Sequence, residues 1–492
     1  MSADELALGV RTAPVDALTL QRAFSRLIWL CTLVVGAMAL VYTPLLSWRL
    51  LRPEQSAQAW ALGLFALCIA VGLLWLLRAR LARITQLVSD GALSFNSRTW
   101  FCAVLLIGVA LRLVWVYLFP TEPISDDRIY AQLARQLATE GSYAMVGSYA
   151  YWPPGYPLLI AGLMRVFGVD APITVPLNLF LFILSMGATL GIARYLGQEA
   201  AGRIAILLLA LWPSYFSSAG IPSKEMVLIG LLPTILFLYL QGMRGRPINM
   251  WTAVAGLLLG GCALVQPSVM LFPFALLCCE LLLERSFLKI GIRVAFVITM
   301  GALAVLPWSL RNYEVFGAVV PISTNGGDNF YRANNEWATG GFTERGKVDL
   351  SGLPEREVDR LGKQLALEWI RSHPQDFLEL AVEKQIRFMG DDAGGIYVTM
   401  RRAIESEPPT RAYAVAKAGA NMFWMAVWLL VIAAAWQALQ GKFRTETALV
   451  MLPLLYFFGL HSVFESSGKY HAAAWAFIAL TAALVFCSRE RQ

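Results

Sequence analysis

Long apolar stretches recur along this chain, and they constrain its fold more than any other feature. A helix crosses a bilayer with about 20 apolar residues, and each stretch reaches roughly that length. A soluble protein could not bury so much apolar surface, since 58% of the 492 residues are hydrophobic and only 15% are charged. We therefore predict an all-α, polytopic membrane protein with about twelve transmembrane helices. The predicted spans are 27–47, 57–78, 99–119, 172–196, 201–219, 224–242, 249–264, 268–284, 290–310, 412–438, 446–461 and 470–487.

Basic residues concentrate in alternate loops between these spans. They are Arg22, Arg26, Arg78, Arg80, Arg83, Arg98, Arg244, Arg246, Arg285, Lys289, Arg293, Lys442, Arg444, Arg489 and Arg491. Cytoplasmic loops carry an excess of Lys and Arg, so the pattern predicts that these loops and both termini are cytoplasmic. The net charge of +7 is mostly this topology signal and forms no compact patch suited to nucleic acid. The seven cysteines lie within or at the ends of spans, so we expect neither disulfides nor a Cys-ligated metal site.

Four segments remain on the outer side, and they hold nearly every polar group that could do chemistry. They are loop 120–171, the turn 220–224, loop 311–411 and the turn 465–471. We therefore expect any reaction to take place on the outer, periplasmic face. The predicted organisation is a two-span extension (1–98), a transmembrane core (99–310), an outer loop (311–411) and a three-span segment (412–492).

Both large outer loops show helical patterns. In the first, Ser125 is expected to cap a helix whose opening turn holds Asp126 and Asp127 and which ends at Gly141; a second helix follows Pro153-Pro154-Gly155, from Tyr156 to Phe167. In the second, residues 321–342 are rich in Gly, Asn and aromatic residues, and we expect them to be irregular. Two amphipathic helices are predicted from Glu355 onwards, separated by a break at His373-Pro374.

Asp126 and Asp127 are the leading candidates for chemistry. Acidic residues often cap helices, but a carboxylate pair beside an apolar span is costly unless it has a function. One of the two is predicted to act as a general base, and the residues do not say which. Lys224-Glu225 after Ser223 can be a plain Ser-capped helix start, yet it enters the same outer region, where a lysine suits a phosphate and a carboxylate suits sugar hydroxyls.

Several other side chains are candidates for substrate or phosphate binding: Tyr130, Trp152, Arg311, Lys469 and His471. Arg311 and Lys469 are cations at span ends, and His471 is expected to be a hydrogen-bonding partner more than a metal ligand. The three histidines have no metal-ligand spacing, and the acid pair lacks the intervening residue of a DxD motif. Glu225 could join the pair around one divalent cation, but we predict no metal and no cofactor. Arg112, inside a span, is expected to face protein or a water-filled cavity; pairing with an acid is left open, because nothing in the sequence identifies a partner.

The order of several motifs resembles bacterial GT-C glycosyltransferases, in particular the protein O-mannosyltransferase and lipid A aminoarabinose transferase group. The motifs are the acid pair, Pro153-Pro154-Gly155-Tyr156-Pro157, Pro307-Trp308-Ser309-Leu310-Arg311-Asn312-Tyr313, Ser323-Thr324-Asn325-Gly326-Gly327 and Trp369-Ile370 followed by His373-Pro374. The resemblance covers residues 99–480. It implies an inverting transferase in a bacterial inner membrane, with a polyprenyl-phosphate-linked sugar as donor and a glycan, lipid or protein as acceptor.

In that family an acid of the first outer loop is essential, which corresponds to Asp126 or Asp127, and a second acid corresponds to Glu225. The family often carries a lysine directly before the Pro-Pro, where this chain has Trp152. Phosphate binding is then left to Lys224, Arg311 and Lys469. Two rival functions stay open: a lipid or sugar transporter, which would place polar groups in several mid-membrane helices, and a glycan polymerase or ligase of another fold.

Overall fold

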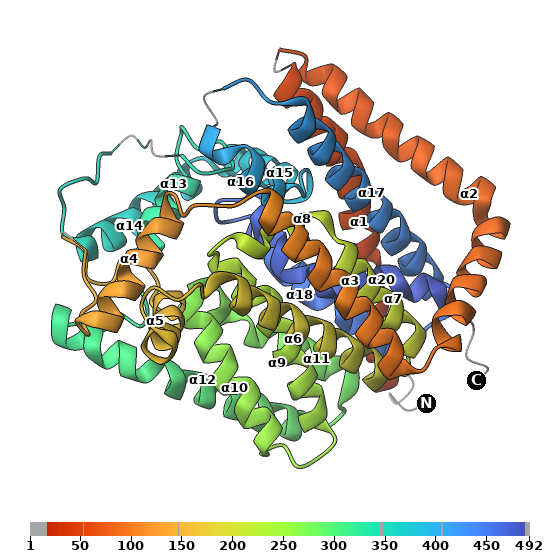
Figure 1. Ribbon diagram of the computed structural model, residues 1–492, viewed down its shortest axis with the longest axis horizontal. Coiled ribbons are helices and arrows are strands. Elements are labelled where there is room, and N and C mark those ends of the chain that lie inside the picture. Colours follow the sequence, from red (N-terminus) through yellow and green to blue (C-terminus); the bar gives the residue numbers. More distant parts are fainter. Residues whose placement is uncertain are drawn as a thin grey trace, which may run out of the picture.

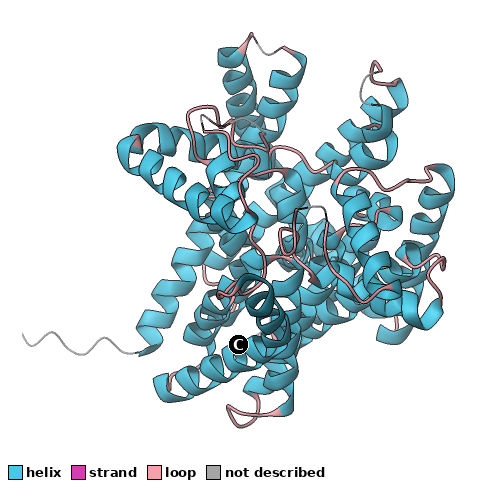
Figure 2. Ribbon diagram, turned by 90° about the vertical axis from the view of Figure 1, so that its left-hand side faces the viewer, coloured by secondary structure: helices cyan, strands magenta, loops and turns pink. Residues whose placement is uncertain are grey.

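The computed structural model describes residues 17–52, 54–145, 147–343, 346, 348–404 and 407–487. Over these residues the chain is built from α-helices and short 3-10 helices and contains no β-strand, only one isolated bridge between Met145 and Ser148 (Figure 2). The predicted all-α class is therefore confirmed.

Eight helical segments of the described chain are long and apolar enough to cross a membrane, or nine if one bent pair counts as a single span. The eight lie in α1 (Ala17–Leu51), α2 (Ser56–Ser94), α3 (Ser97–Leu118), α6 (Thr174–Tyr195), α9 (Lys224–Met243), α12 (Phe287–Phe316), α17 (Arg411–Leu439) and the segment Gly468–Phe486, which contains α19 (Gly468–His471) and α20 (Trp475–Ala483). The bent pair is α7 (Glu199–Leu211) with Pro213–Gly220, which begins with α8 (Pro213–Ser217). This is a multi-pass membrane protein.

Three more predicted spans coincide with shorter apolar helices. They are α10 (Met250–Val265), the pair η2 and α11 (Pro267–Leu283), and the pair η4 and α18 (Thr445–Leu460). The helical segments were thus predicted correctly, whereas the number twelve and the sidedness of the membrane stay predictions.

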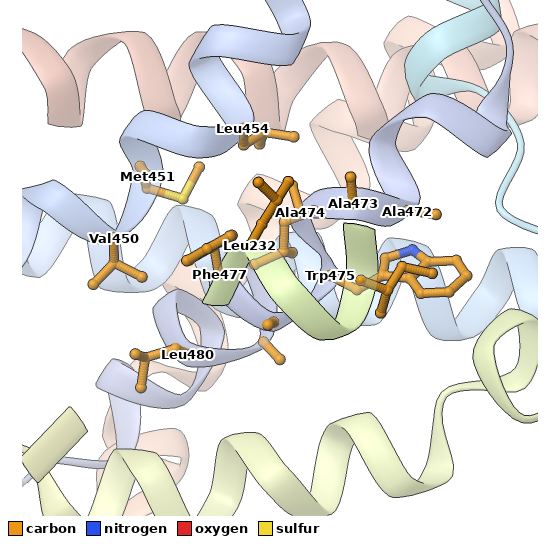
Figure 3. Close-up of a cluster of buried hydrophobic side chains, with 14 of the residues drawn as sticks. Leu232, Val450, Met451, Leu454, Ala472, Ala473, Ala474, Trp475, Phe477 and Leu480 are labelled. Carbon is orange, nitrogen blue, oxygen red and sulfur yellow. The ribbon is translucent and has the colours of Figure 1, made fainter. Parts of the chain in front are cut away.

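Small residues let the central helices approach closely. A Cβ atom on Gly260 would lie 2.3 Å from the carbonyl oxygen of Gly301, and one on Gly256 would lie 2.7 Å from that of Val297, so α10 and α12 pack almost backbone to backbone. Figure 3 shows part of the buried apolar cluster, in which Ala472, Ala473 and Ala474 occur together with Leu232, Met451, Leu454 and Phe477. This packed centre holds the ends of the spans in fixed relative positions.

The loops separate into two groups at opposite ends of the helices. One group contains α4 (Asp126–Thr139), α5 (Gly155–Phe167), α13 (Gly326–Ala333), α14 (Glu355–Ser372), α15 (Pro374–Met389), α16 (Gly394–Met400) and the turn 461–468 (Figure 1). We call this end the loop face. Residues of the other end come from the basic loops, for example Arg444, which is paired with Glu446, and Arg244, which lies over Tyr195.

The two helices predicted in the long loop are confirmed, with the break between α14 and α15 at His373-Pro374. Two local predictions were wrong. Residues 321–342 are not all irregular, because α13 lies within them. Ser125 makes no side-chain capping hydrogen bond; it has a φ of +54°, the one positive φ among the described non-glycine residues. Arg112 faces protein, as predicted: its guanidinium packs over the rings of Phe182 (3.5 Å) and Tyr215 (4.5 Å), and it has no acid partner in the described chain.

Candidate active site

The two aspartates at the start of α4 face different surroundings. Asp127 is largely buried, with 15% of its side chain exposed, and its Oδ2 accepts a hydrogen bond of 2.9 Å from Nη1 of Arg402. Nη2 of the same arginine donates to the carbonyl oxygen of Ile124, 3.4 Å away. Asp126 is exposed and makes no hydrogen bond or ion pair with the part of the chain that the structure describes. Asp126 is thus open to a substrate, whereas Asp127 is engaged with a residue of the long loop.

Burial raises the pKa of Asp127 from 3.8 to about 6. Arg402 opposes this effect through its charge and its hydrogen bond, and the negative charges of Glu225 and Asp126 add to it. Burial, followed by the carboxylates of Asp126, Glu225 and Asp127, also raises the pKa of Tyr130 well above its ordinary value. The adjacent pair Asp126-Asp127 and the distant Glu225 therefore all lie within electrostatic range of one buried tyrosine.

Lys224 and Glu225 reach this place from the first turn of α9. Ser223 caps that helix: its Oγ accepts from the backbone N–H of Glu225 (3.3 Å) and donates to Oε2 of the same residue (2.5 Å). Nζ of Lys224 lies 5.7 Å from the centre of the Tyr130 ring, which joins the start of α9 to α4. Lys224 and Glu225 therefore belong to a Ser-capped helix start, and they also lie near the acid pair; the two interpretations of this segment both hold.

The third part of the candidate site is the turn before the last span, which carries Lys469. Nζ of Lys469 lies 4.9 Å from the centre of the Tyr470 ring, and the hydroxyl of Tyr470 donates to Oε1 of Glu465 (2.5 Å). Lys224 and Lys469 are both within electrostatic range of the Glu225 carboxylate. Neither lysine forms an ion pair with an acid in the described residues. We call Asp126, Asp127, Lys224, Glu225 and Lys469 the acid–lysine cluster.

Chemically, the cluster combines an open carboxylate with two cations at the ends of membrane helices. A carboxylate can take a proton from a hydroxyl group, and ammonium groups stabilise a phosphate as point charges. Its placement beside apolar spans makes it accessible to the headgroup of a lipid. The arrangement therefore fits chemistry between a lipid-linked phosphate and a hydroxyl.

The other predicted site residues lie elsewhere. Arg311 donates to the carbonyl oxygens of Tyr149 (2.8 Å) and Tyr143 (2.7 Å), so its guanidinium holds the first loop to the end of α12. The carbonyl oxygen of Trp152 accepts a hydrogen bond from the Tyr143 hydroxyl (2.8 Å), and the Trp152 ring lines a pocket described below.

His471 is fully buried, and we now assign it to the core and not to substrate binding. Its Nε2 is 2.9 Å from Oδ1 of Asp392, its Nδ1 is hydrogen-bonded with the carbonyl oxygen of Phe388, and its ring stacks on Trp424 at 4.4 Å. It is a hydrogen-bonding partner, as the sequence led us to expect, but its partners are protein groups.

The described residues contain no group of three or more His, Cys, Asp and Glu side chains placed to hold a metal ion. Glu225 is accompanied by two lysines, whose positive charges disfavour a cation beside it. Independence from metal and cofactor stays a prediction.

No protein-family model matches this chain, and no curated protein sequence matches it. Its structure is similar to solved structures of the oligosaccharyltransferase of Archaeoglobus fulgidus. The apo form gives a TM-score of 0.46 at 13% identity over 79% of this chain and 51% of that one. The form tethered to an acceptor peptide gives 0.48 at 13% identity over 80% and 50%.

A third structure, in complex with an inhibitory peptide and a dolichol-phosphate, gives a TM-score of 0.46 at 12% identity over 79% of this chain and 50% of that one. This chain thus spans about half the length of the proteins it matches. Likenesses this distant do not establish a shared activity, so membership of the GT-C group stays a prediction.

Sequence reasoning missed two members of the site. Arg402 follows Asp127 by 275 residues and belongs to no motif, so only its position in an outer loop could have drawn attention to it. Tyr470 is a neighbour of Lys469, and its ring stacks on His461 at 4.1 Å. An aromatic residue beside a candidate cation was the available signal.

Proposed function

We propose that this protein is an inverting glycosyltransferase that moves a hexose or pentose from a polyprenyl-phosphate-linked donor to a hydroxyl acceptor on the periplasmic face of a bacterial inner membrane. One observation carries the proposal: Lys224 and Lys469, which form no ion pair within the described residues, lie over Tyr130 and Tyr470, and the open carboxylate of Asp126 is within electrostatic range of both tyrosines. A phosphate at the bilayer surface suits the lysines, and a hydroxyl suits the carboxylate.

In the proposed reaction, Asp126 accepts the proton of the acceptor hydroxyl. The acceptor oxygen attacks the anomeric carbon from the side opposite the phosphate, and the bond between that carbon and the phosphate oxygen breaks. The polyprenyl phosphate leaves with the electron pair, and Lys224 and Lys469 stabilise its charge. Inversion at the anomeric carbon follows from the single displacement. No metal or cofactor takes part in these steps.

We choose Asp126 as the general base because its carboxylate is open to a substrate, whereas that of Asp127 is already hydrogen-bonded to Arg402. We assign Asp127 a positioning role: its ion pair ties the beginning of α4 to the long loop and so orients Asp126. Glu225, between the two lysines, is placed to hold their ammonium groups apart and to accept a hydroxyl of the donor sugar.

The test uses the full-length chain in nanodiscs, radiolabelled polyprenyl-phosphate hexoses and pentoses, and an envelope extract as acceptor. We expect Asp126→Asn to lower the transfer rate by about 10²–10⁴-fold, the usual range for a general base. Lys469→Ala should raise the KM for the donor, whereas Lys442→Ala, an exposed lysine at the other end of the molecule, should change neither value. EDTA should leave the rate unchanged. Wild-type transfer by both Asp126→Asn and Asp127→Asn would overturn the proposal.

A further inference from the structure

A pocket of about 610 Å³ lies on the loop face, separate from the lysines. This volume falls within the roughly 300–1,000 Å³ of small-molecule sites. Three segments form its walls: residues 147–152 of the first loop, α13 with the turn that follows it, and residues 348–358. The pocket therefore exists only where the first outer loop meets the long one.

Aromatic rings dominate the walls. Trp152, Tyr151, Tyr331 and Trp337 all line the pocket. Trp337 is 50% exposed, and its indole N–H has no hydrogen-bond acceptor in the described chain. The negative face of an aromatic ring attracts the weakly positive C–H groups on one face of a sugar ring. A flat, exposed indole with a free donor is therefore well suited to stack on a saccharide.

The polar groups of the pocket suit hydroxyls. The hydroxyl of Tyr151 donates to Oδ2 of Asp328 (2.5 Å), and Nη2 of Arg332 lies 2.9 Å from the same oxygen. Asp328 and Arg332 thus present an acceptor and several donors next to each other. Adjacent hydroxyls of a sugar can bind such a pair in two hydrogen bonds, each strengthened by the charge on the protein group.

The walls are held in place before any ligand arrives. The buried carboxylate of Glu355 accepts hydrogen bonds from the backbone N–H groups of Tyr149 (2.9 Å) and Ala150 (3.2 Å) and from the Thr324 hydroxyl (3.0 Å). The backbone N–H of Thr324 donates to the carbonyl oxygen of Ala150 (2.9 Å). A fixed pocket loses little conformational entropy when it binds.

The pocket also adjoins the open carboxylate of the acid–lysine cluster. Asp126 lies within electrostatic range of the Tyr151 hydroxyl on the pocket wall and of the Tyr470 hydroxyl beside Lys469. A molecule that fills the pocket can direct a hydroxyl at the group we assign as base.

We propose that this pocket binds the saccharide end of the acceptor, so that the acceptor is a glycan. The inference rests on the proposed function and adds the substrate class. A peptide acceptor often binds by extending an exposed strand, and the described chain contains no strand to extend. The hydrophobic part of a lipid acceptor would find the charged residues Asp328 and Arg332 in the wall instead of an apolar groove.

The test is a binding measurement that needs no donor. Saturation-transfer difference NMR on the full-length chain in nanodiscs would use two probes from the envelope of the source cells: oligosaccharides released by mild acid, and peptides released by protease. We expect signals from sugar C–H protons. Periodate treatment of the oligosaccharides should abolish these signals, because periodate cleaves adjacent diols.

In Trp337→Ala these signals should fall at least fivefold, while Trp337→Phe should keep part of them. The matched control is Trp251→Ala, a 45% exposed tryptophan of α10 at the other end of the molecule, which should leave them unchanged. An unaltered melting temperature shows that each variant is folded. Peptide signals in place of sugar signals, no signal from either probe, or equal signals in Trp337→Ala and wild type would overturn the inference.

The experiments distinguish an error in the assignment of the pocket from an error in the proposed function. Asp126→Asn should bind the oligosaccharides like wild type and fail only in transfer. If sugars bind and both Asp126→Asn and Asp127→Asn transfer normally, the proposed function is wrong and the pocket stands. If Asp126→Asn abolishes transfer and no sugar binds, the pocket assignment alone is wrong.

Discussion

Replacing Asp127 by Asn should make the protein more stable at neutral pH, although it removes an ion pair. The carboxyl is 15% exposed, and its pKa is about 6 in spite of the hydrogen bond from Arg402. Burial therefore outweighs the attraction of the arginine. A neutral amide of nearly the same shape avoids the burial of charge and keeps an oxygen that can accept from Arg402.

The size of the effect follows from the pKa. The difference between the ordinary value of 3.8 and about 6 in the folded chain is equivalent to about 3 kcal/mol. Solvent reaches part of the side chain and screens its charge, so we expect the Asn variant to gain about 1–2 kcal/mol. For a chain of 492 residues that gain corresponds to a melting temperature higher by roughly 1–2 °C.

The pH dependence has a definite sign. Below pH 3.8 the carboxyl is neutral in both folded and unfolded chains, and the two proteins should melt alike. Between pH 3.8 and about 6 the unfolded chain ionises first, so wild type loses stability as the pH rises. The difference between variant and wild type should therefore grow over this window and stay constant above it.

The assay is thermal unfolding in one detergent from pH 4 to 8, followed by tryptophan fluorescence. Arg402→Gln is the companion variant, because it leaves Asp127 without its cation and should be less stable than wild type at pH 7. Asp127→Asn with Arg402→Gln should recover most of that loss. The reasoning would be refuted if Asp127→Asn melted below wild type at pH 7, or if the difference between Asp127→Asn and wild type did not depend on pH.

Two further changes act on buried groups beneath the loop face. Lys384 is fully buried without an acid partner, and burial lowers its pKa to about 7. Lys384→Met removes the hydrogen bonds from this ammonium to Asn334 and Val463 but also its buried charge, so its melting temperature relative to wild type should be highest at pH 6 and should fall as the pH rises towards 10 and the unfolded chain also loses its proton. Asp392 accepts from the indoles of Trp212 (2.6 Å) and Trp475 (3.1 Å) and pairs with His471. Asp392→Ala leaves these buried groups unpaired, at about 1–3 kcal/mol each, and should abolish the monodisperse peak in size-exclusion chromatography, whereas Asp392→Asn should retain part of it.

Much of the fold could be predicted because the burial of apolar side chains contributes most to the stability of the fold and leaves a pattern of apolar runs in the sequence. Runs of apolar residues located every helical segment of the membrane part, and Pro374 located the break between α14 and α15. The lengths of the spans were harder to predict, since the helices α10 and α18 are shorter than the predicted spans in which they lie. The short helix α13 escaped because its glycines and asparagines are typical of loops, and contacts with α14 hold it in place.

The candidate site could be predicted only where it carries its own local signal. Asp126, Glu225 and Lys469 stand at the ends of apolar spans, and topology alone brought them to one side. The partners of Asp127 and Arg112 were not predictable, because they depend on packing between residues far apart in the sequence. His471 looked like a site residue for the same reason, since nothing local shows that α19 turns its ring into the core.

Trp152 offers the sharpest test of how the two substrates are divided. The glycosyltransferases whose motifs this sequence resembles often carry a lysine at this position, and here the ring lines the pocket with Tyr151 and Trp337. If donor phosphate and acceptor glycan bind on opposite sides of Asp126, then Trp152→Lys should not strengthen the binding of the donor. We expect it to raise the KM for the acceptor about tenfold, from the loss of one stacking surface worth about 1 kcal/mol or slightly more, and to leave the KM for the donor unchanged. Steady-state kinetics in which each substrate is varied in turn would measure both values. A lower donor KM in Trp152→Lys, or rescue of Lys469→Ala by this change, would mean that the phosphate reaches the pocket and that the two binding places are one.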